Sequence, residues 1–507
     1  MKNTPLNLGY FLTGALGLFS CANAAKTEQK PNVIFLFVDD LGYADVGFNG
    51  SKFYETPNID ALAKKAVIFE NSYAYPTSSP SRTCLLTGQQ SFRTGVYTVP
   101  VLEKGDSTEN IFSRWTITKD FPFYSEVLAN QGYKNVHLGK WHLVGPYPDQ
   151  ELSQKYPFGE KLAQPDPGDH SWVARHKEDD IRLNYYPDGR GFLKNVGGTY
   201  RGDPALLEGG YHHPDGGYRA PFTNPFIESK PDDEWLTDRL TDEAMDFISG
   251  HKDEPFFINL HYYTVHAPFI ARSQELVEKY MNKEGDPVLG QGMEKGQRRK
   301  SVASYASMIE SLDDNVGRLV EYLKANDLYE NTVIVFSSDN GYNIGANNKM
   351  RGKKRFIYEG GVRVPTFVHW PNKVNARRCT TPISLMDYFP TFVELAGVED
   401  YKGTLDGQSI LPLLQSDDKS FDQRPIYWQL NSQCVHGTCT AMRKGDYKLI
   451  QYLATGELEL YNLVNDPKES TNIAEIENDK ANQMLAEMIE WRKKNNVPLP
   501  PNAVVNN

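Results

Sequence analysis

The segment around which we expect the fold to be organised is residues 78–88, Ser-Ser-Pro-Ser-Arg-Thr-Cys-Leu-Leu-Thr-Gly. Pro80 suits the first position of a helix, because an amide hydrogen has no intrahelical partner there. Ser78 would then stand just before the first turn, where unpaired N–H groups and the helix dipole attract anions. Arg82 lies one helical turn from Ser78 and can fork onto the same anion. The segment therefore predicts a hydroxyl and a guanidinium that face a bound oxyanion.

Two apolar segments end in clusters of oxygen-bearing side chains. Residues 32–38 read Asn-Val-Ile-Phe-Leu-Phe-Val, and residues 332–336 read Thr-Val-Ile-Val-Phe. Continuous hydrophobicity is typical of parallel strands covered on both faces, and ligands bind beyond the carboxyl ends of such strands. If both strands are central, four oxygen ligands converge there: Asp39, Asp40, Asp339 and Asn340. Hard oxygen ligands select calcium or magnesium rather than zinc.

Basic and imidazole side chains follow further expected strands. Residues 133–138 lead into Lys140 and His142, whose side chains point the same way if the segment is extended, so that they could serve an anion and a proton transfer together. Residues 256–260 lead to His266 in a His-Ala-Pro sequence. A metal, a hydroxyl, several cations and two histidines fit in-line transfer of a sulfuryl or phosphoryl group to an oxygen nucleophile.

These motifs, taken in order, resemble those of the type I, formylglycine-dependent sulfatases. That family carries Cys or Ser followed by x-Pro-Ser-Arg and Leu-Thr-Gly, which residues 78–88 match with a serine in first place. The other matches are Gly-Lys-Trp-His at 139–142, His-x-Pro at 266–268 and Lys-x-x-x-Tyr-Glu-Gly-Gly at 354–361. The chain thus resembles serine-type bacterial carbohydrate sulfatases and arylsulfatases, most clearly between residues 32 and 365.

The resemblance implies cofactors and roles for these residues. Ser78 would be oxidised to formylglycine (3-oxoalanine) by a serine-type sulfatase-maturating enzyme, and it would join the four oxygen ligands around one Ca²⁺, with Mg²⁺ less favoured. One hydroxyl of the hydrated aldehyde would attack sulfur. His266 and Lys354 would help the alcohol leave, and His142 would take the proton of the second hydroxyl. The implied catalytic residues are Ser78, Arg82, Lys140, His142, His266 and Lys354.

We expect an α/β fold that resembles alkaline phosphatase, with a large mixed, mostly parallel sheet between helices. Apolar periodicity predicts helices at 56–65, 122–132, 233–249, 301–326 and 387–395. Strands at 425–430, 440–453 and 458–463 indicate a smaller antiparallel sheet, followed by a closing helix at 476–495. This pattern predicts an N-terminal catalytic domain over residues 25–415 and a C-terminal subdomain over residues 416–507.

Composition and charge limit the classes of function. The chain has 507 residues, which is enough for a large core and two domains. Its formal net charge of −11 argues against nucleic acid as a partner, and it means that a local cluster must attract an anionic substrate. Cys434 and Cys439 flank a short turn and could form a disulfide in an oxidising compartment.

The N-terminus predicts export. An apolar run over residues 8–19 is too short to span a membrane and is typical of a secretory signal, which we place at residues 1–24. Two forms of processing compete, namely cleavage before Ala25 and a lipobox that makes Cys21 a lipid anchor. The protein would be periplasmic or lipid-anchored at the surface of a bacterium, with no transmembrane segment.

The substrate is expected to contact residues 145–231, an irregular stretch rich in Pro, Gly and Asp. A stretch of this length is usually a functional loop or an insertion, and we interpret it as the rim of a pocket for exo-acting removal of O-sulfate from a glycan sugar. The candidate contacts are Arg201, Asp203, His212, His213 and Arg219. A generic arylsulfatase, a phosphoester or phosphonate hydrolase of the alkaline-phosphatase-like superfamily, and a non-catalytic glycan-binding surface protein are the alternatives.

Overall fold

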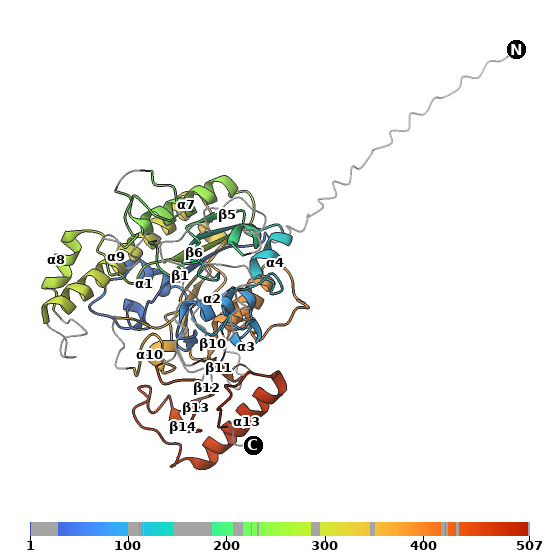
Figure 1. Ribbon diagram of the computed structural model, residues 1–507. Helices are drawn as coiled ribbons and strands as arrows, with labels where there is room; N and C mark the ends of the chain where they lie inside the picture. The colour runs from blue at the N-terminus through green and yellow to red at the C-terminus, as the bar shows by residue number, and fades with distance from the viewer. Residues whose placement is uncertain are drawn as a thin grey trace.

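An eight-stranded sheet lies at the centre of the larger part of the molecule (Figure 1). The computed structural model describes residues 1, 29–99, 111, 113–114, 116–144, 185–205, 216–224, 226–230, 233–284, 295–344, 350–416, 421, 424–431 and 435–504. The strands are β1 (Asn32–Val38), β2 (Val67–Phe69), β4 (Lys134–Gly139), β5 (Lys194–Val196), β6 (Phe256–Tyr262), β7 (Thr332–Ser338), β8 (Phe367–His369) and β9 (Arg377–Cys379). Their order is β5-β4-β6-β1-β7-β8-β2-β9.

Seven of these strands run in the same direction, because β8 alone is antiparallel to its neighbours β7 and β2. β1 lies between β6 and β7 and is parallel to both. The expected mixed, mostly parallel sheet is therefore confirmed. Since parallel strands end at the same edge, the segments that follow β1, β4, β6 and β7 meet there.

Helices cover both faces of the sheet, which explains why β1 is apolar throughout. Ile34, Leu36 and Val38 pack into a cluster with α1 (Pro57–Ala63), α7 (Leu236–His251), α8 (Gln274–Asn282) and α9 (Lys295–Ala325). Val33, Phe35 and Phe37 pack into the opposite cluster with α2 (Ser78–Thr87), α4 (Tyr124–Asn130), α11 (Tyr388–Leu395) and α12 (Leu411–Gln415). Both faces of each central strand are thus removed from water.

The C-terminal sheet is an antiparallel meander, as expected. It consists of β11 (Ile426–Leu430), β12 (Cys439–Lys444), β13 (Tyr447–Tyr452) and β14 (Leu458–Asn462), followed by α13 (Asn478–Asn495). One face contacts the larger part of the molecule, where Nε1 of Trp428 donates to the carbonyl oxygen of Ala74 at 2.9 Å. The other face packs on α13, where Tyr427 and Trp491 stack with ring centroids 4.1 Å apart. The domain boundary at 415/416 falls where α12 ends and remains a prediction.

Short elements complete the described part of the chain. They are α3 (Ser91–Thr94), α10 (Glu359–Val362), the paired strands β3 (Ser72–Tyr73) and β10 (Ile383–Ser384), and 3-10 helices at Gly47–Asn49, Pro187–Gly189, Tyr329–Asn331 and Leu385–Asp387. Among the described helices, none has both the length and the apolarity needed to cross a membrane. The expected signal peptide lies outside the described residues except for Met1, and so does Cys21. Of the expected Cys434–Cys439 pair, Cys434 lies outside them as well.

Candidate active site

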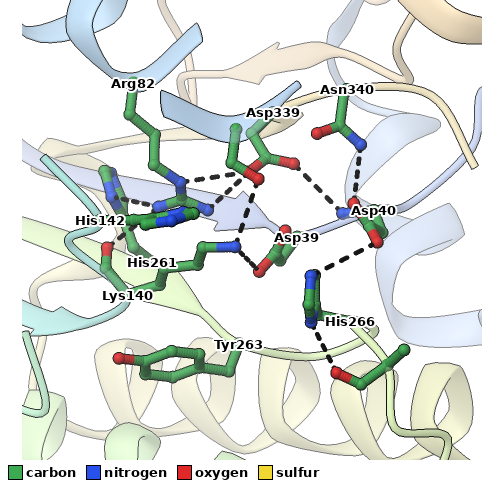
Figure 2. A network of polar contacts seen from close by, with 12 residues as sticks. Asp39, Asp40, Arg82, Lys140, His142, His261, Tyr263, His266, Asp339 and Asn340 are labelled. Atoms are coloured by element: carbon green, nitrogen blue, oxygen red, sulfur yellow. Dashed lines mark hydrogen bonds and ion pairs between the residues drawn. The ribbon is translucent and has the colours of Figure 1, made fainter. Parts of the chain in front are cut away.

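Carboxylates from two adjacent strands meet at the carboxyl edge of the large sheet (Figure 2). β1 and β7 pair with Val38 opposite Ser338, so the residues that follow each strand emerge side by side. The backbone N–H of Asp40 donates to Oδ1 of Asp339 at 3.2 Å, and Nδ2 of Asn340 donates to Oδ1 of Asp40 at 2.8 Å. The structure therefore brings together the four side chains that the sequence indicated as ligands, and all four are fully buried.

Three oxygen atoms in this cluster lack a hydrogen-bond partner, namely Asp39 Oδ1, Asp40 Oδ2 and Asn340 Oδ1. Unpaired buried oxygens are costly, and one cation would satisfy them together. Ligand atoms of Asp39, Asp40 and His266 lie within 4.8 Å of one another. Carboxylate and amide oxygens are the ligands that calcium and magnesium prefer, so the residues present fit a hard divalent cation.

Helix α2 presents Ser78 to the carboxylate cluster. The helix begins at Ser78 itself, two residues earlier than expected, and Pro80 occupies its first turn, where a missing N–H costs nothing. Nζ of Lys140 donates to Oγ of Ser78 at 3.2 Å and to Oδ2 of Asp39 at 2.5 Å. Lys140 thus connects the hydroxyl to the carboxylates, and its side chain is wholly buried.

The guanidinium of Arg82 is engaged by protein groups. Nε and Nη2 donate to Oδ2 of Asp339 at 3.1 and 2.9 Å. Nη1 donates to the carbonyl oxygen of Lys140 at 3.0 Å and lies 3.1 Å from Nδ1 of His261. The helical spacing of Ser78 and Arg82 predicts that this fork binds an anion. In the structure the fork holds Asp339 instead, so Arg82 fixes the geometry of the acidic cluster.

His142 enters the site through an unusual backbone conformation. The φ angle is 95° at Gly139, where β4 ends, and 59° at His142. The segment is therefore not extended, and the argument from alternating side chains does not explain why Lys140 and His142 lie together. Left-handed backbone is uncommon outside glycine. It is held by a hydrogen bond from the His142 N–H to Thr199 O at 3.0 Å and one from Ser79 Oγ to His142 O at 2.9 Å.

Lys354 and His266 approach Asp40 from two other segments. Nζ of Lys354 lies 2.6 Å from Oδ1 of Asp40, whereas Lys353 is exposed. The lysine four residues before Tyr358 is therefore the one that reaches the site. Nε2 of His266 lies 3.9 Å from Oδ2 of Asp40, and its Nδ1 lies 2.6 Å from the carbonyl oxygen of Ala267. Because a carbonyl only accepts, Nδ1 carries the proton and Nε2 faces the acidic cluster.

Burial and charge repulsion give the acidic cluster perturbed pKa values. Burial, together with repulsion from Asp339, raises the pKa of Asp39 well above its ordinary value despite the attraction of Lys140. Burial is also the largest single influence on Asp40, but Lys354, His266 and Lys140 together outweigh it, so the pKa of Asp40 is lowered. Three carboxylates held this close repel one another, which is a further reason why a cation fits the site.

The two site histidines are neutral at pH 7. Burial, and then the charge of Lys140, holds the pKa of His142 well below its ordinary value. Burial, and then the charge of Lys354, lowers the pKa of His266 to about 3. A neutral imidazole can accept a proton, so both side chains are in the state that a general base requires.

The residues suggested for substrate binding have different positions. Nη2 of Arg201 donates to Oδ2 of Asp203 at 3.1 Å, and the turn that carries this pair packs against His142. Arg219 instead donates to the carbonyl oxygen of Arg272 at 2.8 Å and lies over the ring of Trp235, so its visible role is structural. His212 and His213 lie outside the described residues.

Sequence reasoning missed His261, which the structure places beneath Arg82. It lies in β6, between residues that are otherwise mostly apolar, and both of its flanks in the strand are buried. A histidine within a strand of this kind is a recognisable signal, because a buried polar side chain needs a partner. Burial, and then the neighbouring His137, holds the pKa of His261 well below its ordinary value, so its imidazole is neutral.

The fold is a mostly parallel sheet between helices, and its carboxyl edge holds a hydroxyl, buried cations and an acidic cluster that fits a divalent cation. Residues 31–398 match the family model described as Sulfatase, and residues 352–495 match the model described as N-sulphoglucosamine sulphohydrolase, C-terminal. The chain belongs to the sulfatase family and is a sulfuric ester hydrolase.

Similar proteins support this assignment along nearly the whole chain. A sulfatase of Formosa agariphila is 30% identical, with 95% of this chain and 92% of the relative covered. An N-acetylglucosamine-6-O-sulfatase of Bacteroides thetaiotaomicron is 27% identical, with 97% and 92% covered. The solved structure of Ps i-CgsB in complex with k-i-k-neocarrahexaose has a TM-score of 0.70 and 29% identity, covering 94% of this chain and 95% of that one.

Proposed function

We propose that the protein removes O-sulfate from a sugar of a sulfated glycan, acting on the terminal residue, with Ser78 matured to formylglycine. The observation that carries the proposal is the position of the Ser78 hydroxyl. It lies 3.2 Å from the buried ammonium of Lys140, which in turn contacts Asp39. A nucleophile held between a buried cation and an acidic metal cluster suits attack on an anionic ester.

The acidic cluster would hold one divalent cation, with calcium proposed ahead of magnesium. The oxygens of Asp39, Asp40, Asp339 and Asn340, together with the group at position 78, would be its ligands. Such an ion supplies charge neutralisation and a fixed point for the sulfate oxygens. Three unpartnered oxygens in the cluster support this assignment.

The remaining side chains have distinct tasks in the proposed reaction. Lys140 and Lys354 offer positive charge to the sulfate in a site from which water is largely excluded, where that charge is worth most. His266 and Lys354 assist departure of the alcohol: the ammonium of Lys354 is the proton donor, because Nε2 of His266 is unprotonated and can only accept a hydrogen bond. His142, buried and neutral, accepts the proton that must leave the nucleophile for sulfate to be released. Arg82 holds Asp339 in place.

The sugar substrate is supported by the kinds of relative found. One relative is named N-acetylglucosamine-6-O-sulfatase, and a similar solved structure is that of a complex with k-i-k-neocarrahexaose. We propose that residues within 145–231 form the sugar pocket, as expected from the sequence, although the range also contains β5, a strand of the central sheet. We also propose export to the periplasm or the cell surface, with residues 1–24 as the signal, lipidation at Cys21 as an alternative to cleavage before Ala25, and a serine-type maturase as partner.

The two rival functions make different demands on the site. A phosphoester or phosphonate hydrolase with two metals would need a second group of ligands. Within the described ranges, the group found is the one that contains Asp39, Asp40 and His266. A glycan-binding protein without activity would have no need for a hydroxyl in contact with a buried lysine, as found at Ser78.

The first experiment is mass spectrometry of the peptide that carries Ser78, on protein from its native host or from a host with a serine-type maturase. The expected mass is lower than that of the serine peptide by one pair of hydrogen atoms. Activity would then be measured on a panel of sulfated monosaccharides. An unmodified serine in mature, active protein would contradict the proposed nucleophile, and activity on phosphate esters alone would contradict the proposed reaction.

A further inference from the structure

A turn at residues 199–203 packs directly on the catalytic imidazole. The N–H of His142 donates to Thr199 O at 3.0 Å. A β-carbon on Gly202 would lie 2.6 Å from Cε1 and 3.0 Å from both ring nitrogens of His142, so the glycine allows the turn to approach the face of the ring. This contact brings the backbone of the next residue, Asp203, close to His142.

Asp203 carries a carboxylate oxygen that the protein leaves without a partner. Its side chain is 6% exposed, and Oδ2 accepts a hydrogen bond from Nη2 of Arg201 at 3.1 Å. Oδ1 is buried and has no hydrogen-bond partner. A buried carboxylate oxygen without a partner is costly, so its presence calls for an explanation.

The unpartnered Oδ1 of Asp203 is not explained by a role in orienting His142. If Asp203 held the imidazole, Nδ1 of His142 would be paired with it, but Nδ1 is also buried and unpartnered. Arg201 uses only the other oxygen of the carboxylate. The positive charge of Lys140 lowers the pKa of Asp203 as well as that of Asp39. The Asp203 carboxylate therefore lies within electrostatic range of Lys140, which contacts Ser78.

We propose that Asp203 recognises the sugar: its Oδ1 accepts a hydrogen bond from a hydroxyl of the sugar unit that carries the sulfate, while Arg201 fixes the carboxylate. This inference rests on the proposed function. A sulfate ester held at Ser78 carries its sugar ring next to His142, and the ring hydroxyls, such as the 4-hydroxyl of a 6-O-sulfated sugar, then lie beside the site. A buried acceptor built for a hydroxyl discriminates strongly against substrates that lack one, because it is then left unpaired.

The test compares two substrates on the same variants. N-acetylglucosamine-6-O-sulfate or N-acetylgalactosamine-6-O-sulfate, whichever the wild-type protein hydrolyses faster, supplies the hydroxyls, and 4-nitrophenyl sulfate supplies none. We expect Asp203→Asn to lower kcat/KM for the sugar by about 10- to 100-fold, the loss of one charge-assisted hydrogen bond, and to leave 4-nitrophenyl sulfate within about threefold of wild type. Arg201→Gln, which keeps the carboxylate, should give a smaller loss of the same kind.

Three results would overturn the inference. If Asp203→Asn lowers kcat/KM equally for both substrates, Asp203 supports the catalytic centre in general. If the variant keeps the wild-type kcat/KM for both substrates, Asp203 does not contact the sugar. If Asp203→Asn does not fold, as judged by its thermal midpoint, Arg201→Gln gives the same comparison. Failure of the wild-type protein on every sulfated substrate would instead overturn the proposed function, and this inference with it.

Asp313→Asn is the matched control. Asp313 is a buried carboxylate on α9, and both of its oxygens accept hydrogen bonds from residues of α1. Its replacement removes a buried charge without touching the site. We expect the ratio of sugar to aryl activity to be unchanged in this variant, which separates a specific effect at Asp203 from a general effect of lost stability.

Discussion

Arg82 and His261 form a contact on which the position of Asp339 depends. An arginine only donates hydrogen bonds, so Nδ1 of His261, 3.1 Å from Nη1, must be the acceptor and the ring proton must lie on Nε2. Replacement His261→Leu would leave a buried guanidinium N–H unpaired. We expect kcat to fall at least about tenfold, with a smaller change in KM, because Arg82 would shift and would no longer hold Asp339 in place.

Rescue distinguishes this positioning role from simple packing. His261→Asn keeps an acceptor near the place of Nδ1 and should recover much of the lost kcat, measured on the preferred sulfated sugar. His137 is the control, because it is a buried neighbour whose ring nitrogens contact Asn259 and the carbonyl oxygen of Gly139. If His137→Leu lowers kcat as much as His261→Leu does, or if the asparagine gives no rescue, the contact with Arg82 is not the cause.

Asn340 gives a prediction about the metal that does not depend on activity. Its Oδ1 is buried and unpartnered, while its Nδ2 donates to Asp40. We expect Asn340→Ala to weaken calcium binding by about tenfold or more, because one neutral ligand and the amide that orients Asp40 are lost together. Isothermal titration of chelator-treated protein measures the affinity, and the rise in thermal midpoint on adding calcium measures the linked stability. Equal affinities in wild type and variant would contradict the assignment of this ligand.

Among the helices, α1 depends on a cap supplied by α9. The carboxylate of Asp313 accepts from the N–H groups of Asn58 and Ile59 at 3.0 and 2.8 Å, where α1 has no carbonyl partners of its own. Burial raises the pKa of Asp313 to about 6, so the carboxylate is charged at pH 8. At that pH, Asp313→Asn should reduce the free energy of unfolding by about 1–2 kcal/mol, measured by urea denaturation. A variant as stable as wild type would contradict the capping role.

The elements that could be predicted from the sequence are those with one strong local cause. β1 and β7 are continuous apolar runs, and their pairing could be expected because parallel buried strands sit at the centre of such sheets. The convergence of Asp39 and Asp339 followed from that pairing alone. Helix α2 begins two residues before the position that Pro80 predicts, because a proline is acceptable at several positions of a first turn and does not fix one of them.

Other parts of the site depend on contacts that no local pattern encodes. The left-handed backbone at His142 is stabilised by Thr199 and Ser79, which lie far away or on another element. The partner of Arg82 could not be read from helical spacing, since Asp339 reaches it across 257 positions of the chain. Local propensity therefore predicts which side chains reach the site, and tertiary contacts decide what each one binds.

At the scale of the whole molecule, a buried charge cluster connects the C-terminal sheet to the segment that carries Lys354. Lys448 on β13 contacts Glu359 of α10 at 3.2 Å and Glu469 at 2.9 Å. Glu469 also accepts a hydrogen bond from the N–H of Glu359 at 2.7 Å. Because α10 begins a few residues after Lys354, this cluster fixes the position of the C-terminal sheet relative to the active site.

The cluster holds two carboxylates around one ammonium, which makes the stability of the protein depend on pH. Burial, with repulsion from Glu359, raises the pKa of Glu469 to about 7 although Lys448 and the more distant Arg443 oppose it. The folded protein therefore binds this proton more tightly than the unfolded chain. The resulting stability is fully present below the ordinary pKa of a glutamate and is lost as the pH rises toward about 7.

Replacement Glu469→Gln should remove this dependence, because the amide keeps the acceptor for the Glu359 N–H and carries no charge at any pH. We expect the variant and wild type to have similar thermal midpoints at pH 5. At pH 8 the variant should be more stable, by an amount on the order of 2 kcal/mol, since burial and repulsion from Glu359 then oppose the charge of Glu469. Thermal unfolding across pH 5–8 measures the difference. Parallel curves for the two proteins would mean that Glu469 titrates normally and that Lys448 neutralises both carboxylates.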